Sequence, residues 1–105
     1  MQMEWSDGKK RCCWANPKNE RYIRYHDEEW GVPVYDDGKL FEMLVLECFQ
    51  AGLSWECVLN KREAFRAAFY GFDLEAVCAY GEDKLEALRN DPGIIRNRLK
   101  IQAAV

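Results

Sequence analysis

The stretch LFEMLVLECFQA, residues 40–51, decides how this chain folds. Nine of its twelve residues are apolar, and on a helix they cover nearly the whole circumference, a pattern typical of a central helix. Asp36 or Asp37 is placed to cap the start of this helix, and Gly52 is placed to end it. The stretch therefore predicts a helical domain built around residues 40–51.

The residues that follow repeat the helical pattern. Ser54 is placed to cap a helix whose apolar stripe continues to Phe69 and which Gly71 closes. Three further helices are predicted, over residues 73–80, 82–89 and 94–105. No segment shows the strict two-residue alternation of a strand, so the sequence predicts an all-α fold with no sheet.

The two ends of the chain differ in character. Residues 1–11 are polar and are expected to be frayed, whereas residues 12–38 are dense in aromatic side chains and turns, with a short helix expected over 19–26. The helix over 94–105 ends on apolar residues without a glycine or proline stop. Two alternatives are open: a short domain with a frayed end, or a longer domain of which residues 12–105 are the N-terminal part. We prefer the second, because an apolar face needs a partner and the last carbonyls need a cap.

The composition excludes several classes of function. The 105 residues carry 15 basic and 18 acidic side chains, a net charge of −3, which argues against a basic, histone-like nucleic-acid binder. No apolar run approaches the roughly 20 residues that a membrane helix needs, and no apolar leader segment is visible at the N-terminus. Five cysteines, an odd number, favour free thiols in a reducing compartment, and we expect a cytoplasmic protein.

One basic cluster stands out against this acidic balance. Its members are Arg89, Arg96, Arg98 and Lys100. They would either meet phosphates close to the turn at Pro92 and Gly93 or form a solvated helix face. Taken by itself, the solvated face is the simpler interpretation.

Glu47 is the most unusual side chain of the central helix. Its neighbours three and four positions away are Met43, Leu44, Gln50 and Ala51, none of which is cationic. A carboxylate on an apolar helix is costly unless it meets a hydrogen-bond donor or a ligand. Glu47 is therefore a ligand-binding acid, a partly exposed residue at a gap in the core, or the partner of an arginine from elsewhere.

Four aromatic side chains are candidates for the wall of a binding slot. They are Trp14, Tyr25, Trp30 and Trp55. Any one of them alone is more simply explained as core. Together with Glu47 they would hold a flat ligand, because stacking on an aromatic ring is worth about 1–3 kcal/mol per nucleobase. A cationic ligand would gain further from the ring faces and the carboxylate.

Cys12 and His26 have the chemistry of half a metal site. His26 is the only histidine, and a cysteine with a histidine suits zinc, whose structural sites take four ligands. The alternative is a free thiol and a surface or capping histidine. The adjacent Cys12 and Cys13 also suggest a redox function, but neighbouring cysteines rarely form an unstrained disulfide.

Short motifs follow one another along the chain in a distinctive order. They are Arg11-Cys12-Cys13-Trp14, Tyr25-His26-Asp27-Glu28-Glu29-Trp30-Gly31-Val32-Pro33, Leu40-Phe41-Glu42-Met43, Leu46-Glu47, Gln50-Ala51-Gly52-Leu53-Ser54-Trp55 and Gly93-Ile94-Ile95-Arg96. In this order they resemble the N-terminal part of the 3-methyladenine DNA glycosylase type I family. The resemblance covers roughly residues 11–105, and the second and fifth motifs are highly specific together.

The resemblance implies the N-terminal portion of an α-helical glycosylase domain of the helix-hairpin-helix superfamily. Enzymes of this family excise 3-methyladenine from alkylated double-stranded DNA by base flipping and hydrolysis of the N-glycosidic bond, which leaves an abasic site. By resemblance, Glu47 hydrogen-bonds the extruded base. Tyr25 and Trp55 then stack on or enclose the base, and Trp14 and Trp30 complete the wall.

The resemblance also implies a structural zinc ion that clasps the two ends of the domain, with Cys12 and His26 as two of its four ligands. The other two ligands and the helix-hairpin-helix lie in a C-terminal portion that this chain does not contain. Two functions are open: an enzyme of DNA repair, or a non-catalytic module that keeps the pocket for methylated adenine. A complete family member is expected to be a monomer, and a shortened one to self-associate through its open apolar surface.

Overall fold

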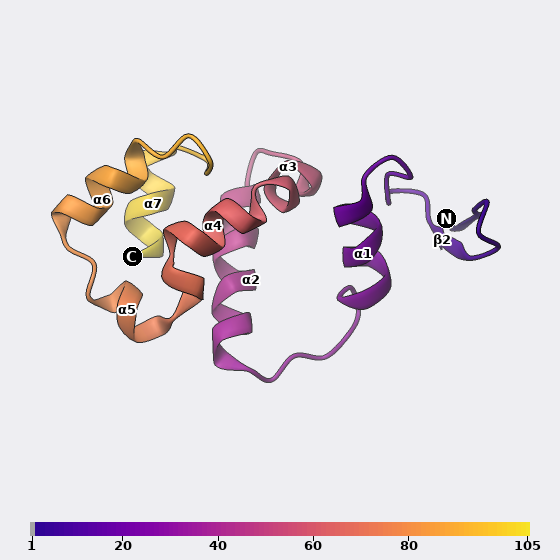
Figure 1. Cartoon of the computed structure of the whole chain (residues 1–105), viewed down its shortest axis with the longest axis horizontal. Coiled ribbons are helices and arrows are strands. Elements are labelled where there is room, and N and C mark those ends of the chain that lie inside the picture. Colours follow the sequence, from indigo (N-terminus) through magenta and orange to yellow (C-terminus); the bar gives the residue numbers. More distant parts are fainter. Residues whose placement is uncertain (1) are drawn as a thin grey trace. The chain divides into compact units, whose positions relative to one another are not determined.

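The computed structural model describes residues 2–105, and the chain divides into two compact units, Met1–Pro33 and Val34–Val105. Helices account for most of the described residues, as predicted, and Figure 1 shows them as coils joined by short loops. The α-helices are α1 (Glu20–Glu28), α2 (Asp37–Gln50), α3 (Trp55–Asn60), α4 (Arg62–Ala68), α5 (Leu74–Cys78), α6 (Glu82–Arg89) and α7 (Arg98–Ala104).

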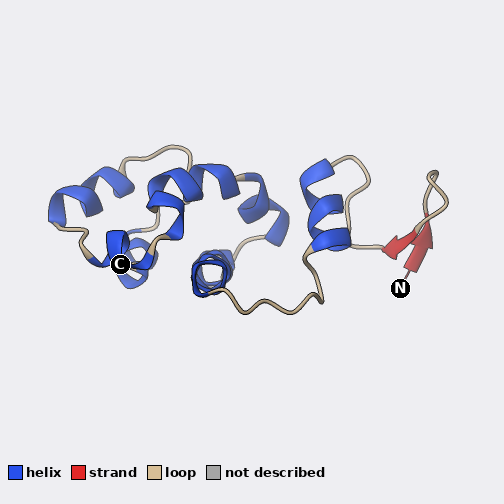
Figure 2. Cartoon of the chain, turned by 60° about the horizontal axis from the view of Figure 1, so that its bottom comes forward, coloured by secondary structure: helices blue, strands red, loops and turns tan. Residues whose placement is uncertain are grey.

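The predicted helical fold is confirmed, with one local departure: a short two-stranded antiparallel sheet opens the first unit, where frayed residues were expected (Figure 2). Strand β1 (Gln2–Glu4) pairs with strand β2 (Lys10–Cys12). In the connecting turn the Trp5 amide donates to the Lys9 carbonyl at 2.9 Å, and Gly8 adopts a φ of +81°. Each strand has three residues, too few for a two-residue alternation to be recognised in the sequence.

Side-chain caps begin most of the helices. The capping residues are Asn19 for α1, Asp36 for α2, Ser54 for α3, Asp73 for α5 and Asn97 for α7. Each side chain accepts a hydrogen bond from a backbone amide that has no partner within its own helix. Of the two aspartates proposed for α2, the structure selects Asp36, whose Oδ2 accepts from the Lys39 amide at 2.9 Å.

The second unit packs its helices around one apolar core. The central helix α2 contributes Val45, Leu46 and Phe49, all of which are buried. The other buried members are Val58, Phe65, Ala68, Phe69, Phe72, Val77, Leu88, Ile94 and Ile101. α2 contacts α3, α7 and the short 3₁₀ turn Tyr70–Phe72. The stretch over residues 40–51 is thereby confirmed as the helix around which the unit packs.

Two predicted helices differ most from the structure. One long predicted helix is broken at Lys61 into α3 and α4, where the Lys61 amide donates to the Val58 carbonyl at 3.1 Å in a tightened turn. The helix predicted over 94–105 begins only with α7. Ile94 is instead buried ahead of the helix, and the Asn97 side chain accepts from a backbone amide of the first turn of α7 at 3.0 Å.

Lys100 connects α7 to the end of α2. Its Nζ donates to the carbonyls of Phe49 and Ala51 at 2.8 Å and 2.7 Å. The last carbonyls of a helix have no partner within it, and a cation there also meets the negative end of the helix dipole. Lys100 therefore fixes the end of α2, the helix that carries Glu47.

Gly93 lets the loop ahead of Ile94 pass close to α4. A Cβ atom at Gly93 would lie 2.9 Å from the Cβ of Ala64, so one of the two would have to move. We expect Gly93→Ala to lower the free energy of unfolding by about 1–3 kcal/mol through overpacking. Urea denaturation measures this, with Gly81→Ala as the control, because a Cβ at Gly81 meets nothing within 4 Å. Equal losses in the two variants would contradict the close approach.

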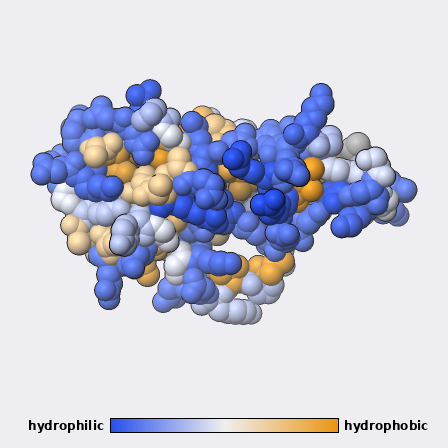
Figure 3. All heavy atoms as spheres, in the orientation of Figure 1, coloured by the Kyte–Doolittle hydropathy of each residue, from blue (hydrophilic) through white to orange (hydrophobic). Residues whose placement is uncertain are grey.

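Polar residues cover most of the face shown in Figure 3, with smaller apolar patches between them. Among the described residues, no helix has the length and apolar character needed to cross a membrane. All five cysteines lie in the described part of the chain, and all are free.

Candidate functional site

Four of the predicted site residues gather in the first unit, around Trp14. Measured between ring centroids, Trp14 lies 6.4 Å from Tyr25, 5.4 Å from Trp30 and 5.2 Å from His26. His26 also stacks on Trp30 at 5.7 Å. Trp14 is 37% exposed and Trp30 is 52% exposed, so part of each indole remains accessible to a ligand. The structure thus groups three of the four predicted aromatic residues into one open cluster.

Trp55, the fourth aromatic residue, belongs to the second unit. It is the first residue of α3 and is half-buried against the core. In the turn between α2 and α3, the Gln50 Nε2 atom donates to the Leu53 carbonyl at 2.7 Å. Gly52 adopts a φ of +83° in this turn, a conformation that strains residues with a Cβ. The Gln-Ala-Gly-Leu-Ser-Trp motif is therefore a defined turn that holds Trp55 at the start of α3.

Glu47 also belongs to the second unit and is exposed on α2. The expectation that α2 is covered nearly all round is wrong, because Leu40, Leu44 and Cys48 are exposed as well. Of the alternatives that the sequence left open for Glu47, the structure agrees with an exposed carboxylate. Such a carboxylate is accessible to a ligand without any rearrangement of the core.

Glu42 is the buried acid of α2, and the sequence analysis did not single it out. It is 5% exposed, and its Oε2 accepts from the Nε of Arg62 at 3.0 Å and the Nε of Arg66 at 2.6 Å. Burial by itself would raise the pKa of Glu42, but the two arginines outweigh burial and lower it. Glu42 thus ties α2 to α4. Its partners lie 20 and 24 positions away, beyond any helical spacing.

His26 contacts both Cys12 and Asp27. Its Nε2 accepts a hydrogen bond from the Cys12 backbone amide at 3.2 Å, so Nε2 carries no proton. Its Nδ1 lies 2.9 Å from the Asp27 Oδ1 and is therefore the protonated nitrogen, which donates to the carboxylate. The structure brings together the two residues predicted as metal ligands.

Arg11 holds Asp27 in place. Arg11 is 4% exposed; its Nε and Nη2 donate to the Asp27 carboxylate at 2.9 Å and 2.8 Å, and its Nη1 donates to Asp7 at 3.0 Å. The guanidinium also lies 4.6 Å from the Trp5 ring centroid. Hydrogen bonds from Arg11 and then from His26 hold the pKa of Asp27 well below its usual range. Sequence reasoning missed this pair, although Asp27 stands beside the only histidine.

Cys12 and His26, the two residues predicted as zinc ligands, meet through the Cys12 backbone amide. The Cys12 thiol is free and half-buried, and the lone pair of the His26 Nε2 already accepts the Cys12 backbone amide. A zinc-bound histidine commonly donates its other ring N–H to a carboxylate, as His26 does here to Asp27. The described chain contains no cluster of three or more His, Cys, Asp or Glu side chains suited to a metal ion. Zinc binding by Cys12 and His26, as two of four ligands, therefore stays a prediction.

The basic cluster is partly engaged inside the second unit. Arg89 pairs with two glutamates of α6 at 3.0 Å, and Lys100 caps α2. Arg96 and Arg98 are exposed. The interpretation as a single phosphate-binding surface is therefore not supported for Arg89 and Lys100, whose cationic groups already have partners.

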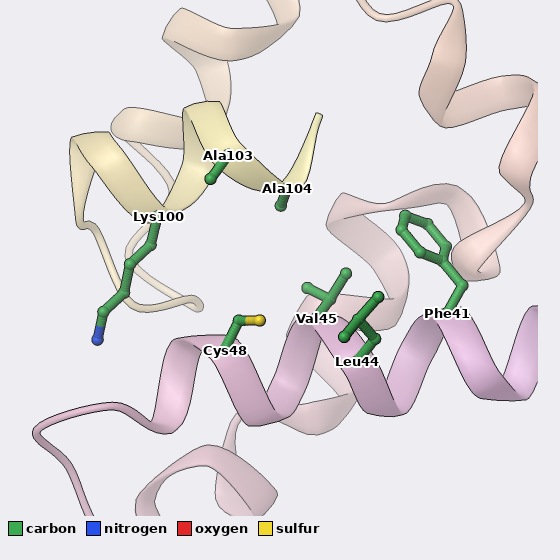
Figure 4. A pocket seen from close by; sticks show the side chains of 7 residues that line it. All are labelled: Phe41, Leu44, Val45, Cys48, Lys100, Ala103 and Ala104. Carbon is green, nitrogen blue, oxygen red and sulfur yellow. The ribbon is translucent and has the colours of Figure 1, made fainter.

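An apolar groove of about 230 Å³ lies between α2 and α7. Its lining residues are Phe41, Leu44, Val45, Cys48, Lys100, Ala103 and Ala104. Figure 4 shows Val45 and Cys48 of α2 on one side and the two alanines of α7 on the other. Lys100 is the only charged residue of this lining, and its Nζ is bound to carbonyls of α2. The groove thus offers apolar surface, and self-association through it stays a prediction.

Comparison with known proteins gives one consistent result. A family model described as methyladenine glycosylase matches residues 14–105. DNA-3-methyladenine glycosylase 1 of Escherichia coli (strain K12) is 54% identical over 96 residues, which are 91% of this chain and 51% of the relative. The chain spans about half the length of the curated relatives it matches.

Solved structures agree with the sequence comparison. A crystal structure of 3-methyladenine DNA glycosylase I has a TM-score of 0.85 at 53% identity, covering 90% of this chain and 51% of that one. A tyrosine-to-phenylalanine variant of 3-methyladenine DNA glycosylase I, solved in complex with 3-methyladenine, has a TM-score of 0.84 at 39% identity, covering 90% and 50%. The helical fold of these enzymes is therefore shared by the chain over nearly its whole length.

Proposed function

The chain belongs to the methyladenine glycosylase family, and from this premise we propose that it is the base-binding part of an enzyme that excises 3-methyladenine from alkylated double-stranded DNA. The observation that carries the proposal is the open cluster of Trp14, Tyr25 and Trp30. The exposed carboxylate of Glu47 adds the charge that a cationic base requires. A relative solved with 3-methyladenine bound supports the choice of ligand.

The chemistry of the damaged base explains these residue types. Methylation at N3 leaves the purine cationic and already a good leaving group, so the enzyme needs little acid catalysis. It must take the base out of the stack, which costs a few kcal/mol. Aromatic faces and one carboxylate then stabilise the extruded cation. Water completes the hydrolysis of the N-glycosidic bond and leaves an abasic site in the DNA.

Each residue of the proposed pocket has a distinct part in this chemistry. Glu47 accepts hydrogen bonds from the extruded base and offsets its positive charge. Tyr25 and Trp55 stack on the base or enclose it, and Trp14 and Trp30 complete the wall. Base–aromatic stacking of this kind is worth about 1–3 kcal/mol per base, which is comparable to the cost of unstacking.

A structural zinc ion is part of the same proposal. Cys12 and His26 would hold it from one side, and two further ligands would come from outside residues 2–105. Bound there, zinc would contribute folding energy and no chemistry on the base. For zinc to bind there, the His26 Nε2 would have to exchange its hydrogen bond from the Cys12 backbone amide, 3.2 Å long, for the metal.

A second candidate function rests on the open aromatic cluster alone. The chain would then be a module that binds methylated adenine without acting on DNA. Two assays on the same 105-residue chain separate the functions: titration with free 3-methyladenine, and release of 3-methyladenine from alkylated DNA. Binding with release supports the enzyme, and binding without release supports the module. Absence of both would contradict the proposed pocket.

We expect Glu47→Gln to weaken the binding of 3-methyladenine by about tenfold or more, since a hydrogen bond to a charged group contributes about 1.5–3 kcal/mol. Quenching of tryptophan fluorescence during the titration measures the dissociation constant. Where the chain releases the base from DNA, the variant should slow that release as well.

Glu75→Gln is the matched control for this substitution. Glu75 is an exposed glutamate in the first turn of α5, so its loss removes the same charge without touching α2. The control should bind 3-methyladenine as the wild type does. Unmethylated adenine, which lacks the N3-methyl group, should bind weakly and respond little to either variant. If Glu47→Gln binds 3-methyladenine with unchanged affinity, its assigned role is wrong.

A further inference from the structure

The turn between α2 and α3 lies at the surface of the second unit. Residues 51–54 connect the helix that carries Glu47 to the helix that begins with Trp55, and all four of them are exposed. Leu53, the bulky apolar member of the turn, is 38% exposed. Glu47 and Trp55 stand on either side of this turn in the sequence. A DNA strand that presents a base to both of them therefore passes close to it.

Lys100 brings a second segment to the same turn. Its Nζ donates to the carbonyl of Ala51, the first residue of the turn, at 2.7 Å, and to the carbonyl of Phe49 at 2.8 Å. Figure 4 shows the Lys100 side chain reaching from α7 toward the end of α2. Arg96 and Arg98 precede Lys100 by four and two positions. Both arginines therefore belong to the segment that Lys100 holds beside the exposed turn.

The side chains of Arg96 and Arg98 have no protein partner. Both residues are exposed, and among the described residues no hydrogen bond or ion pair involves either guanidinium group. Residues 92–105 contain three cations and no aspartate or glutamate, although the chain as a whole is acidic. Since Lys100 is bound to the two carbonyls, Arg96 and Arg98 are the cations of this segment that can bind an external anion.

Acidic side chains ahead of this segment are already engaged. Glu86 of α6 attracts Arg98, but its carboxylate accepts hydrogen bonds from Arg89 at 3.0 Å and from Asn90 at 3.2 Å. The Oδ1 atom of Asp91 accepts from the backbone amide two positions further on, at 2.8 Å. These acids therefore leave both arginines able to pair with an anion from outside the chain.

From this arrangement we infer that Arg96 and Arg98 bind backbone phosphates of the DNA beside the extruded base, and that Lys100 positions them there. The inference rests on the proposed function and adds to it the residues that hold the DNA strand. Guanidinium groups bind phosphate oxygens through two parallel N–H bonds, and such contacts position DNA without reading its sequence. A chain with a net charge of −3 thus meets DNA through a local basic surface.

The salt dependence of DNA binding tests the inference. The probe is a short DNA duplex labelled with fluorescein, whose anisotropy is measured with the 105-residue chain over a range of salt concentrations. We expect Arg96→Gln/Arg98→Gln to reduce the slope of log affinity against log salt by about two, because each lost phosphate contact releases about one counterion fewer. At about 0.1 M salt the affinity should fall by about tenfold or more. An unchanged slope would overturn the inference.

Arg24→Gln/Lys39→Gln is the matched control, because it removes two exposed cations that stand beside acids. Arg24 lies four positions from a glutamate on either side, and Lys39 follows two aspartates. The control should keep the wild-type slope. Equal reductions in the two double variants would show that only net charge matters, which overturns the inference.

Arg96→Lys/Arg98→Lys separates charge from folding, since it keeps both positive charges. It should retain most of the wild-type slope, because counterion release depends on the charge at the phosphate. A slope as small as that of Arg96→Gln/Arg98→Gln would mean that the two arginines do not act through their charge, and would overturn the inference.

Titration with free 3-methyladenine distinguishes the inference from the proposed function. Arg96→Gln/Arg98→Gln should bind the free base as the wild type does, because the two arginines contact phosphates; a weaker affinity for the free base would overturn this role. A wild type that binds the free base but no DNA would overturn the inference and leave the base pocket supported. If DNA binding depends on the two arginines but the free base does not bind, the inference is supported and the proposed pocket is contradicted.

Discussion

Phe69→Ala is expected to lower the free energy of unfolding of the second unit by about 3–5 kcal/mol, a large share of the stability of a unit of this size. Phe69 is fully buried, and its ring stacks on Phe72 at 5.6 Å and on Phe65 at 6.2 Å. The centroid of the Tyr80 ring lies 6.5 Å from that of the Phe69 ring. The substitution leaves a cavity bordered by aromatic rings from separate elements, which cannot close up together.

Urea denaturation followed by far-ultraviolet circular dichroism measures this loss as a lower midpoint with an unchanged m value. Tyr35→Ala is the matched control, because it removes an aromatic ring that is 88% exposed. The control should change the free energy of unfolding by less than about 0.5 kcal/mol. Similar losses in both variants would mean that the aromatic core does not carry the stability assigned to it.

Glu42→Gln is expected to lower the free energy of unfolding by about 3 kcal/mol. This is the lower end of the losses found when one partner of a buried ion pair is removed. The Glu42 side chain is 7% exposed, and that of its partner Arg62 is 12% exposed. The amide keeps the shape of the carboxylate but leaves two arginines without their shared negative charge. The destabilisation therefore comes from uncompensated charge and not from a lost contact area.

Glu63→Gln is the control, because Glu63 pairs with the same Arg66 at 2.8 Å but its side chain is 72% exposed. Exposed ion pairs contribute about 0–1 kcal/mol, so this variant should stay close to the wild type. If Glu63→Gln lowers the free energy of unfolding as much as Glu42→Gln does, burial of the ion pair is not the cause of the loss.

The effect of Glu42 should also depend on pH. Its pKa is lower in the folded protein than its ordinary value of 4.5, so the unfolded state takes up the proton first as pH falls. The stabilisation is complete above that ordinary value and is lost as pH falls through the lower, folded value. Thermal unfolding of wild type and Glu42→Gln should therefore differ at pH 7 and converge in acid. A difference that is constant down to acid pH would contradict the ion pair.

Local signals in the sequence predicted most of the second unit. Asp36 and Ser54 cap helices where predicted, because capping depends on residues within one turn of each other. The helix over 82–89 has the predicted bounds. The break at Lys61 and the late start of α7 were not predicted, since both follow from how neighbouring segments pack and not from local pattern.

The sequence predicted the aromatic residues of the candidate site better than it predicted the surroundings of its charged residues. The cluster of Trp14, Tyr25 and Trp30 could be identified as a group because the residues stand close together in the sequence. Glu47 could be named, but its exposure could not, because a helix pattern does not tell which apolar face the rest of the fold covers. The contact of Arg11 with Asp27 could not be predicted either. The two residues lie 16 positions apart on a strand and a helix, and no periodic sequence pattern links residues of two such elements.

The cap that Lys100 places on α2 also constrains the order in which the chain can fold. Its contact with the Phe49 carbonyl joins residues 51 positions apart, so a loop of that length must close before the last turn of α2 is complete. Local helices form faster than contacts of such sequence separation. The end of α2 should therefore be among the late parts of the second unit to gain protection from hydrogen exchange during refolding. The last turn of α2, next to Glu47, would thus become fully ordered only after α7 has packed against α2.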